Sequence, residues 1–362
     1  MRVEFIAFTE KGFQQAQRLA SCLPGDAQAD IARGFGEGKE PLSAWAERGF
    51  ADADALVLVG AAGIAVRAIA PYAESKAKDP AVIVADEAGN WVIPLLSGHI
   101  GGANRLARTL AAGTGAQAVL TTATDVRGVW AVDDWATARG MAIPNPARIK
   151  AVSSRLLAGG RVSLASDLPL AGPVPDGVDA VALPLSPGSS SAEEGADRSG
   201  DASTDGGRLA SFDVLVSPFD RPCPQSALRI VPRRAIVGVG CRRGASEEAL
   251  AHAVDEALAR AGILPLAVAE ARSIDLKRDE RGLIAFAERR GWPLRFFSAD
   301  ELSAVPGKFA PSEFVERTTG VDNVCERAAS ACGETVLVHK TVVDGVTVAV
   351  ALDVSPILWN ED

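Results

Sequence analysis

Short apolar runs alternate with amphipathic, alanine-rich stretches along most of the chain, a pattern that favours a layered α/β fold. Residues 55–59 (ALVLV) are all apolar, which is typical of a buried strand. The runs at 82–85 and 91–96 are joined by Glu87-Ala88-Gly89-Asn90, a turn sequence that predicts a hairpin. In this first part we expect strands at 3–8, 55–59, 82–85, 91–96 and 119–122, and helices at 12–23 and 104–112.

Residues 133–232 have a different sequence pattern, because prolines and glycines interrupt the apolar runs. Within them, residues 186–211 hold almost no large apolar side chains, so burial cannot offset the entropy of ordering them. We therefore expect a disordered insertion there, inside a middle module whose short strands lie at 162–165, 214–216 and 229–231.

The α/β pattern returns after residue 232. Residues 235–239 predict a buried strand, and Ser246 followed by Glu247 and Glu248 is typical of a helix N-terminus. Ser298 and Glu301 have the spacing of a capping box, which predicts a short helix. The other elements that we expect here are helices at 247–261 and 280–290 and strands at 336–339 and 346–352.

These patterns predict an α/β fold with two layered domains, residues 1–132 and 233–362, that flank a smaller and looser middle module, residues 133–232. At 362 residues and 48% hydrophobic composition, the chain is long enough for two or three domain cores.

The composition excludes several classes of protein. A net charge of −9 argues against a nucleic-acid-binding protein, which usually carries an excess of basic residues. The five cysteines form no C-x-x-C pair and the three histidines lie far apart in sequence, so a zinc finger is excluded. Glu4 disfavours a secretory signal, and Pro94 and Gly98 interrupt the longest charge-free stretch, which disfavours a membrane span. We expect a cytoplasmic protein with reduced thiols and no nucleic-acid or membrane partner.

Two glycine-rich segments of the N-terminal domain follow predicted strands. Gly60, Gly63 and Arg67 lie between a strand and a helix, where backbone amides and the helix dipole attract a carboxylate or phosphate; a packing turn would explain the glycines as well. His99 is surrounded by glycines in SGHIGGANR (97–105), so its imidazole has room to reach a ligand and exchange a proton. Since this loop follows a strand, we expect it at the carboxyl edge of a sheet, where α/β proteins bind ligands.

Polar residues also gather at two other turns of this domain. Asp86 and Glu87 form the tip of the predicted hairpin, either as a solvated turn or as part of a site. Residues 121–125 (TTATD) bring three hydroxyls and a carboxylate to the end of a predicted strand, where they either close a turn or bind carboxylates of a ligand.

The C-terminal domain has its own glycine-rich loop, GVGCRRG (238–244). Its spacing is one residue longer than the dinucleotide fingerprint, and no acidic residue closes a second strand in the expected place, so a nicotinamide enzyme is disfavoured. Arg242 and Arg243 form a reasonable clamp for carboxylates, unless they are surface residues on a packing turn. Other charged positions have the same ambiguity: Lys277 and Glu280 at a helix entrance, Glu326, and the strand-end pair His339-Lys340.

The order and spacing of these motifs resemble the cobalt-precorrin-5A hydrolase family of cobalamin biosynthesis. The resemblance covers about residues 55–134, through GAAGIAVRAIAP (60–71), KAKDPAV (76–82), DEAG (86–89) and LLSGHIGGAN (95–104). It resumes in the C-terminal domain through GVGCRRG (238–244), SIDLKRDERGL (273–283), PLRFFSADEL (293–302) and VCERAA (324–329). Residues 186–211 are an insertion by comparison, and Cys325 stands where a small residue is more usual.

The resemblance implies a hydrolase whose substrate is a cobalt-containing, ring-contracted corrinoid, in which the ring-A acetate forms a δ-lactone to the meso carbon. Water opens the lactone, and the meso carbon leaves with its methyl group as acetaldehyde. No cofactor or metal site of the protein is implied, because the cobalt belongs to the substrate. The expected partners are this small molecule and neighbouring enzymes of the pathway.

The chemistry requires a base that activates water, with His99 as the first candidate and Glu87 as the second. The amides of Gly101 and Gly102 are candidate donors to the carbonyl oxyanion, where one well-placed donor is worth about 3–4 kcal/mol. A large flat ring suits a cleft between domains, so we expect the His99 loop and the Gly240 loop to face each other. The candidate substrate-binding residues are Gly60, Gly63, Arg67, Lys76, Ser97, Gly101, Gly102, Asn104, Arg105, Gly240, Arg242, Arg243, Lys277, Glu280 and Glu326.

Two alternatives come from other classes of protein. One is a carrier or scaffold that binds labile corrinoid intermediates without hydrolysing them, since the C-terminal domain resembles a stand-alone protein of the pathway. The other is a tetrapyrrole methyltransferase, although the sequence has no persuasive motif for S-adenosylmethionine. Release of acetaldehyde separates a hydrolase from a carrier.

Overall fold

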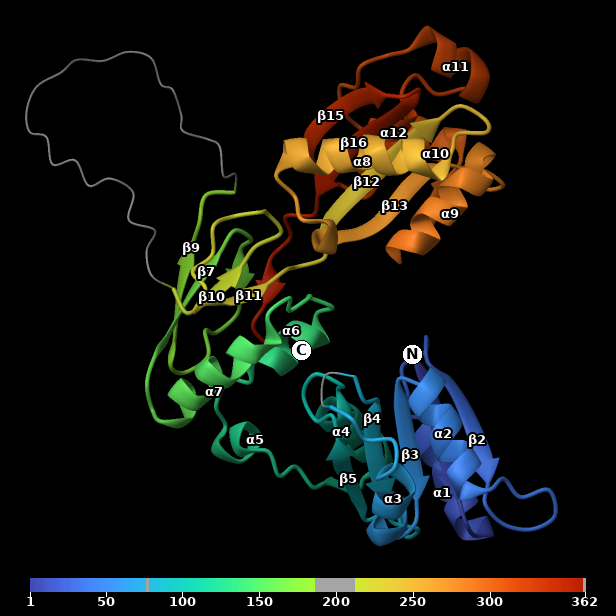
Figure 1. Ribbon diagram of the computed structural model, residues 1–362, viewed down its shortest axis with the longest axis vertical. Helices are drawn as coiled ribbons and strands as arrows, with labels where there is room; N and C mark the ends of the chain where they lie inside the picture. The colour runs from blue at the N-terminus through green and yellow to red at the C-terminus, as the bar shows by residue number, and fades with distance from the viewer. Residues whose placement is uncertain (76–77, 186–211, 361–362) are drawn as a thin grey trace, which may run out of the picture. The chain divides into compact units, whose positions relative to one another are not determined.

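The computed structural model of the chain (Figure 1) describes residues 1–75, 78–185 and 212–360. Their contacts form two units, Met1–Ala138 (unit 1) and Arg139–Asp362 (unit 2). Strands and helices alternate in both units, which confirms the predicted layered α/β class. The predicted insertion and the candidate Lys76 lie outside the described residues, and the three predicted domain ranges stay a prediction. No helix in the described part of the chain is both long and apolar enough to cross a membrane.

Unit 1 is built on a six-stranded sheet with the order β2-β1-β3-β4-β5-β6. Its strands are β1 (Arg2–Ala7), β2 (Gln28–Arg33), β3 (Ala55–Val59), β4 (Ala81–Ala85), β5 (Trp91–Leu96) and β6 (Gln117–Ala118). The first four run parallel, whereas β5 pairs antiparallel with β4 and parallel with β6. The predicted hairpin is confirmed as β4 and β5, and the last two strands run against the other four.

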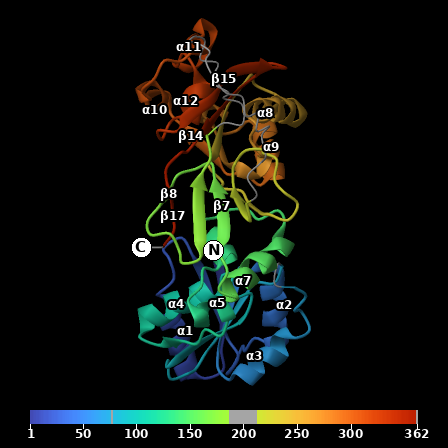
Figure 2. The same cartoon turned by 90° about the vertical axis from the view of Figure 1, so that its left-hand side faces the viewer.

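Helices cover both faces of this sheet, because neighbouring residues of a strand point to opposite faces. Phe5 belongs to the buried cluster that α1 (Glu10–Ala20) and α4 (Ala103–Thr114) cover. Ile6 belongs to the opposite cluster, which α2 (Leu42–Asp52) and α3 (Ala62–Ile69) cover. Figures 1 and 2 both show α3 and the N-terminus of the chain at opposite ends of unit 1.

Two predictions for this part need correction. The strand predicted at 119–122 is wrong, because only Gln117 and Ala118 pair with β5 and Thr122 precedes a helix, α5 (Ala123–Arg127). Asp125 lies in the first turn of α5, where the helix dipole favours a carboxylate. A second short helix, α6 (Val132–Ala138), follows. The exposed strand β2 was not predicted, because its sequence QADIAR lacks an apolar run.

The first part of unit 2 is a four-stranded, all-parallel sheet with the order β11-β10-β7-β9. It contains β7 (Val162–Ser166), β9 (Val178–Ala182), β10 (Val214–Val216) and β11 (Leu228–Ile230), and is preceded by η1 (Pro146–Arg148) and α7 (Ile149–Leu157). The strands β7, β10 and β11 were predicted. Separately, β8 (Leu170–Ala171) pairs with β17 (Ile357–Leu358), so the end of the chain is tied to this part.

The rest of unit 2 is a five-stranded sheet with the order β14-β13-β12-β16-β15. The strands β12 (Ala235–Cys241), β13 (Val268–Ile274) and β14 (Leu294–Phe297) are parallel, and β16 (Val346–Leu352) runs antiparallel to β12 and to β15 (Thr335–Val343). Helical segments of this part are α8 (Glu247–Ala261), η2 (Pro265–Ala267), η3 (Asp275–Lys277), α9 (Arg281–Arg290), α10 (Ala299–Ala304), α11 (Glu313–Thr319) and α12 (Val324–Ala329). The predicted N-cap at Ser246 and the capping box at Ser298 are both confirmed.

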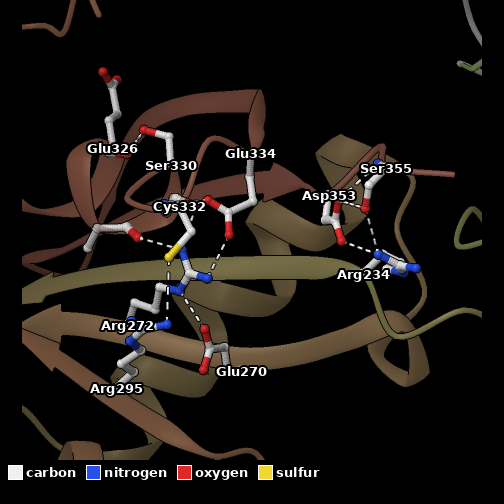
Figure 3. Close-up of polar contacts among 12 residues, drawn as sticks. Arg234, Glu270, Arg272, Arg295, Glu326, Ser330, Cys332, Glu334, Asp353 and Ser355 are labelled. Atoms are coloured by element: carbon white, nitrogen blue, oxygen red, sulfur yellow. Dashed lines mark hydrogen bonds and ion pairs between the residues drawn. The ribbon is translucent and has the colours of Figure 1, made fainter. Parts of the chain in front are cut away.

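A buried arginine joins α12 to the five-stranded sheet. Arg272 of β13 is 3% exposed, and its guanidinium donates to Glu270 and Glu334 at 2.6 Å each (Figure 3). It also donates to the carbonyl oxygens of Ala328 and Ala329, at 3.4 and 3.5 Å, where α12 ends. All three guanidinium nitrogens therefore have partners, which is the condition for tolerating a buried charge.

Helix α12 approaches β12 so closely that only glycine fits at position 238. A β-carbon on Gly238 would lie 1.9 Å from the carbonyl oxygen of Cys325 and 2.8 Å from the amide nitrogen of Ala329. The first glycine of the GVGCRRG motif is therefore a packing residue inside β12, and the predicted loop begins only after Cys241.

We expect Gly238→Ala to lower the free energy of unfolding by about 1–3 kcal/mol or more, because the helix has to move away from the strand. Gly25→Ala is the matched control, since a β-carbon there meets no atom within 4 Å and the change should stay within about 0.5 kcal/mol. Urea unfolding followed by circular dichroism measures both variants. Equal midpoints for the two would contradict this packing.

Candidate functional site

The direction of β5 places the candidate residues of unit 1 at two opposite edges of the sheet. Gly60 follows β3 and Glu87 follows β4, so both lie where the parallel strands end. His99 follows β5, which is antiparallel to β4, so its loop lies where the parallel strands begin. The prediction that the His99 loop lies at the carboxyl edge of the parallel strands is therefore wrong. A strand as long as β5 spans about 20 Å, so His99 and Glu87 are exclusive alternatives as the base.

The edge with Gly60 and Glu87 has few polar contacts in the part of the chain that the structure describes. The amide of Gly60 donates to the carbonyl oxygen of Ala85 at 2.9 Å, and Gly63 and Arg67 are exposed on α3. Within the described ranges, neither Arg67 nor Glu87 forms an ion pair.

The His99 loop has a geometry that requires its glycines. Ser97 has a φ of 57° and Gly102 a φ of 79°, so the chain turns sharply on both sides of His99. A β-carbon on Gly101 would lie 2.3 Å from that of Ser97, whose buried hydroxyl donates to the carbonyl oxygen of Asp79 at 2.9 Å. The amide of Gly102 donates to the carbonyl oxygen of His99 at 2.9 Å. The prediction that the Gly102 amide donates to the oxyanion is therefore corrected, because this amide already donates to a carbonyl oxygen of its own loop.

Helix α5 brings hydroxyl and carboxylate groups to this loop. The hydroxyl of Thr124 lies 3.0 Å from Nε2 of His99. Asn104 of α4 is 1% exposed and donates to Asp125 at 2.8 Å and to Thr122 at 3.2 Å. The side chain of Asn104 therefore joins α4 to α5 inside the protein.

Three buried polar atoms beside this network lack a hydrogen-bond partner among the described residues: His99 Nδ1, Arg105 Nη1 and Asp134 Oδ1. Burial raises the pKa of the Asp134 carboxyl, and the positive charges of Arg105 and Arg108, with His99 in its protonated form, act against that rise. Groups with shifted pKa values, and buried polar atoms without hydrogen-bond partners, are common at functional sites. We name His99, Arg105, Thr124 and Asp134 the His99 cluster and take it as the candidate active site of unit 1.

Sequence reasoning found only part of this cluster. The run 121–125 predicts polar groups near a ligand, and its members Thr124 and Asp125 do lie beside the His99 loop. Arg108, which pairs with Asp125, and Asp134 were missed. Two adjacent acidic residues before Trp135 are typical of any helix start, so no local signal distinguishes Asp134.

In unit 2, Glu280 holds the loop that follows β12. Its Oε1 accepts from the amide of Gly244 at 2.8 Å, and its Oε2 accepts from Nζ of Lys277 at 3.4 Å. Glu280 is 7% exposed, so it uses both oxygens inside the protein. Gly240 is a packing residue, since a β-carbon there would lie 2.5 Å from the hydroxyl of Thr347.

The two arginines of the same loop are exposed to solvent. Arg242 lies along the β15–β16 turn, where a β-carbon on Gly345 would be 3.5 Å from its Nε. Arg243 lies 3.8 Å from Asp279, with both side chains more than three-quarters exposed. Such a pair is worth about 0–1 kcal/mol, so both arginines remain available to an anion.

Glu326 lies inside the protein and contacts β15. It is 0% exposed, its Oε1 accepts from the amide of Lys340 at 2.6 Å, and the same oxygen is 3.5 Å from Nδ1 of His339. Figure 3 shows its carbonyl oxygen with the hydroxyl of Ser330, which donates to it at 2.9 Å. Glu326 therefore joins α12 to β15.

Across the described ranges, no group of three or more His, Cys, Asp or Glu side chains is placed to hold a metal ion. The expectations that the protein uses no cofactor and that the His99 and Gly240 loops face each other stay predictions.

Three family models match successive parts of the chain. They are described as Cobalamin synthesis G N-terminal for residues 44–125, Cobalamin biosynthesis central region for residues 130–232 and Cobalamin synthesis G C-terminus for residues 235–351.

Individual proteins match over most of their length. A cobalt-precorrin-5A hydrolase of Salmonella typhimurium is 33% identical over 359 residues, which is 97% of both chains. A cobalt-precorrin-5A hydrolase of Priestia megaterium is 29% identical over 305 residues, 82% of this chain and 78% of that one. Among solved structures, a cobalamin biosynthesis protein G homolog from Sulfolobus solfataricus is 19% identical, with 97% of this chain and 96% of that chain covered and a TM-score of 0.40.

We expect Asn104→Asp to lower the free energy of unfolding by about 1–3 kcal/mol near neutral pH, because a carboxylate would replace the amide that donates to Asp125 at 2.8 Å. The loss should shrink as the pH falls, since protonation of either carboxyl restores a donor. Asn90→Asp is the matched control, because Asn90 donates to Asp86 at 3.2 Å in an exposed turn. Urea unfolding at about pH 7 and about pH 5 measures both, and equal losses would contradict the buried contact.

Proposed function

This chain belongs to the cobalt-precorrin-5A hydrolase family, and we propose that it opens the ring-A δ-lactone of cobalt-precorrin-5A in the anaerobic route to cobalamin. Water adds to the lactone carbonyl carbon and the ester C–O bond breaks. The C–C bond between the meso carbon and the macrocycle then breaks: the hydroxyl freed on the meso carbon loses its proton and becomes the aldehyde carbonyl, and the macrocycle keeps the electron pair and takes up a proton. The meso carbon thus leaves with its methyl group as acetaldehyde, and cobalt-precorrin-5B remains. The proposal is supported by the relationship over 97% of both chains and, in the structure, by the His99 cluster.

His99 is the base in this proposal. The hydroxyl of Thr124, 3.0 Å from Nε2, fixes one side of the ring, so the other nitrogen is left for proton transfer. Glu87, the alternative base, forms no ion pair among the described residues and lies at the opposite end of β5 from His99.

Arg105 is the proposed donor to the developing oxyanion. Its buried Nη1 has no hydrogen-bond partner in the described part of the chain, and a charged donor shielded from water stabilises an oxyanion strongly. This role replaces the one expected of the Gly102 amide, while the Gly101 amide remains a candidate. Ser97 and Asn104 hold the loop and the helix that position these groups.

The carboxylates of the macrocycle need cations, each worth about 1 kcal/mol when exposed. In unit 2, we propose that Arg242 and Arg243 bind these carboxylates. Lys277 is a weaker candidate, because its ammonium group already forms an ion pair with Glu280. The other cations proposed for this role in unit 1 are Arg67 and Lys76. Gly60 and Gly63 stay candidates only for main-chain contacts with the substrate.

We propose that the cobalt enters with the substrate and that the protein supplies no cofactor. Neighbouring pathway enzymes as partners and a cytoplasmic location are further proposals, which rest on the pathway and on the composition.

The deciding experiment incubates the purified protein with the lactone corrinoid and assays acetaldehyde. We expect turnover by the wild type, a loss of about 100- to 10,000-fold in His99→Ala, and near wild-type turnover in Glu87→Gln. The reverse order of the two variants would identify Glu87 as the base. Binding of the corrinoid by the wild type without any acetaldehyde would show a carrier instead.

A further inference from the structure

His339 and Lys340 form a β-bulge at the edge of the five-stranded sheet, inside β15 and not at the end of a strand as predicted. The paired residues on either side of them are Val338 and Thr341, so two residues of β15 stand opposite one residue of β16. β15 is the last strand of this sheet, and its outer side pairs with no other strand in the described part of the chain. Bulges at sheet edges often redirect a side chain beside a functional site.

The carboxylate of Glu326 on α12 holds this bulge. Its Oε1 accepts from the amide of Lys340 at 2.6 Å and lies 3.5 Å from Nδ1 of His339. The side chain of Glu326 is 1% exposed, whereas that of His339 is 72% exposed. In Figure 3 this carboxylate points away from the ion pairs of Arg272, so it belongs to the bulge and not to that network. An exposed imidazole therefore has a buried carboxylate behind it.

This arrangement leaves Nε2 of His339 with a free lone pair. A carboxylate beside Nδ1 favours the neutral tautomer that carries its proton on Nδ1. Nε2 forms no hydrogen bond or ion pair within the described ranges, and the exposure of the side chain makes it accessible to a ligand. Histidine ligands of metals usually have a carboxylate or carbonyl behind the other ring nitrogen, which fixes the ring and makes it a better donor.

The other exposed histidine, His252 on α8, has both ring nitrogens beside carboxylates. Its Nδ1 lies 3.0 Å from Asp344 and its Nε2 lies 3.7 Å from Glu256. Both carboxylates are about half exposed, so these are ordinary ion pairs at the surface. His252 therefore offers no free nitrogen and is the natural control for His339.

The number of ligands decides which kind of metal His339 suits. A protein that holds a metal ion by itself needs several ligands, and the described residues bring no group of three or more His, Cys, Asp or Glu together for that purpose. A macrocycle, by contrast, fills the in-plane positions of its metal and leaves the axial positions above and below the ring. One accessible imidazole suits such a metal, and the cobalt of a corrinoid is one that nitrogen ligands bind well.

We propose that His339 is a substrate-binding residue, which coordinates the cobalt of the corrinoid through Nε2, and that Glu326 is a positioning residue for its imidazole; the inference rests on the proposed function. The lone pair of Nε2 forms the bond to cobalt, and a water molecule leaves that axial position. No electron is transferred, so the oxidation state of the cobalt stays the same. The ammonium group of Lys340, which forms no ion pair within the described ranges, is available to a carboxylate of the macrocycle.

The test uses cobinamide in its Co(II) form, a cobalt corrinoid that lacks a nucleotide base of its own. An axial nitrogen splits the cobalt lines of its electron paramagnetic resonance spectrum into triplets, and ¹⁵N-labelled histidine turns these into doublets. We expect triplets with the wild type, their loss in His339→Ala and their retention in His252→Ala. Binding of cobinamide, followed by its absorbance, should weaken about tenfold or more in His339→Ala and stay at the wild-type value in His252→Ala.

Glu326→Gln tests the positioning role, because glutamine keeps an oxygen for the Lys340 amide but offers the imidazole no charge. We expect triplets with a smaller spacing than in the wild type, since the nitrogen becomes a weaker donor, and about tenfold weaker binding of cobinamide. A spacing equal to that of the wild type would overturn the role of Glu326.

Triplets that persist in His339→Ala, or that the wild type does not show, would overturn the coordination by His339. Release of acetaldehyde from the lactone corrinoid would then still support the proposed function. Triplets from the wild type without any acetaldehyde would support the coordination and overturn the proposed function in favour of a carrier.

Discussion

The reversal of chain direction between β4 and β5 decides where the chemistry of unit 1 is located. Asp86 organises the turn: its carboxylate accepts from the amide of Trp91 at 2.6 Å and from the side chain of Asn90 at 3.2 Å, and Gly89 has a φ of 77°. A turn this short joins only antiparallel strands, because parallel strands need a crossover of about a dozen residues or more. As a result β5 ends at the opposite edge from β3, and the His99 loop begins there.

Two buried polar groups show the difference between a structural and a chemical use of charge. Arg272 has a partner for every guanidinium nitrogen, and those partners join β13 to the end of α12. Arg105 keeps one buried nitrogen without a partner in the described residues, beside His99 and Asp134 in the same condition. The first arrangement stabilises the fold, whereas the second keeps hydrogen-bonding capacity for a ligand.

The glycine-rich motif of unit 2 (238–244) contains packing glycines, one of the two explanations that its sequence left open. Gly238 and Gly240 leave room for the main chain of α12 and for Thr347, and Glu280 holds the amide of Gly244. These contacts hold the loop in place, so what remains for an anion is the exposed pair Arg242 and Arg243. The motif therefore supports two exposed cations, the residues that the sequence analysis named as a clamp for carboxylates.

The sequence by itself determined the α/β class, most strands and helix starts, and the family. Strands 55–59 and 91–96, the N-cap at Ser246 and the capping box at Ser298 were predicted at their observed positions, because apolar runs and caps depend on residues a few positions apart. Only the tertiary structure decided which candidates share an edge, which glycine amides are already bonded, and which buried polar atoms lack partners among the described residues. Strand direction and the burial of a lone carboxylate depend on contacts between distant segments, and no local pattern records them.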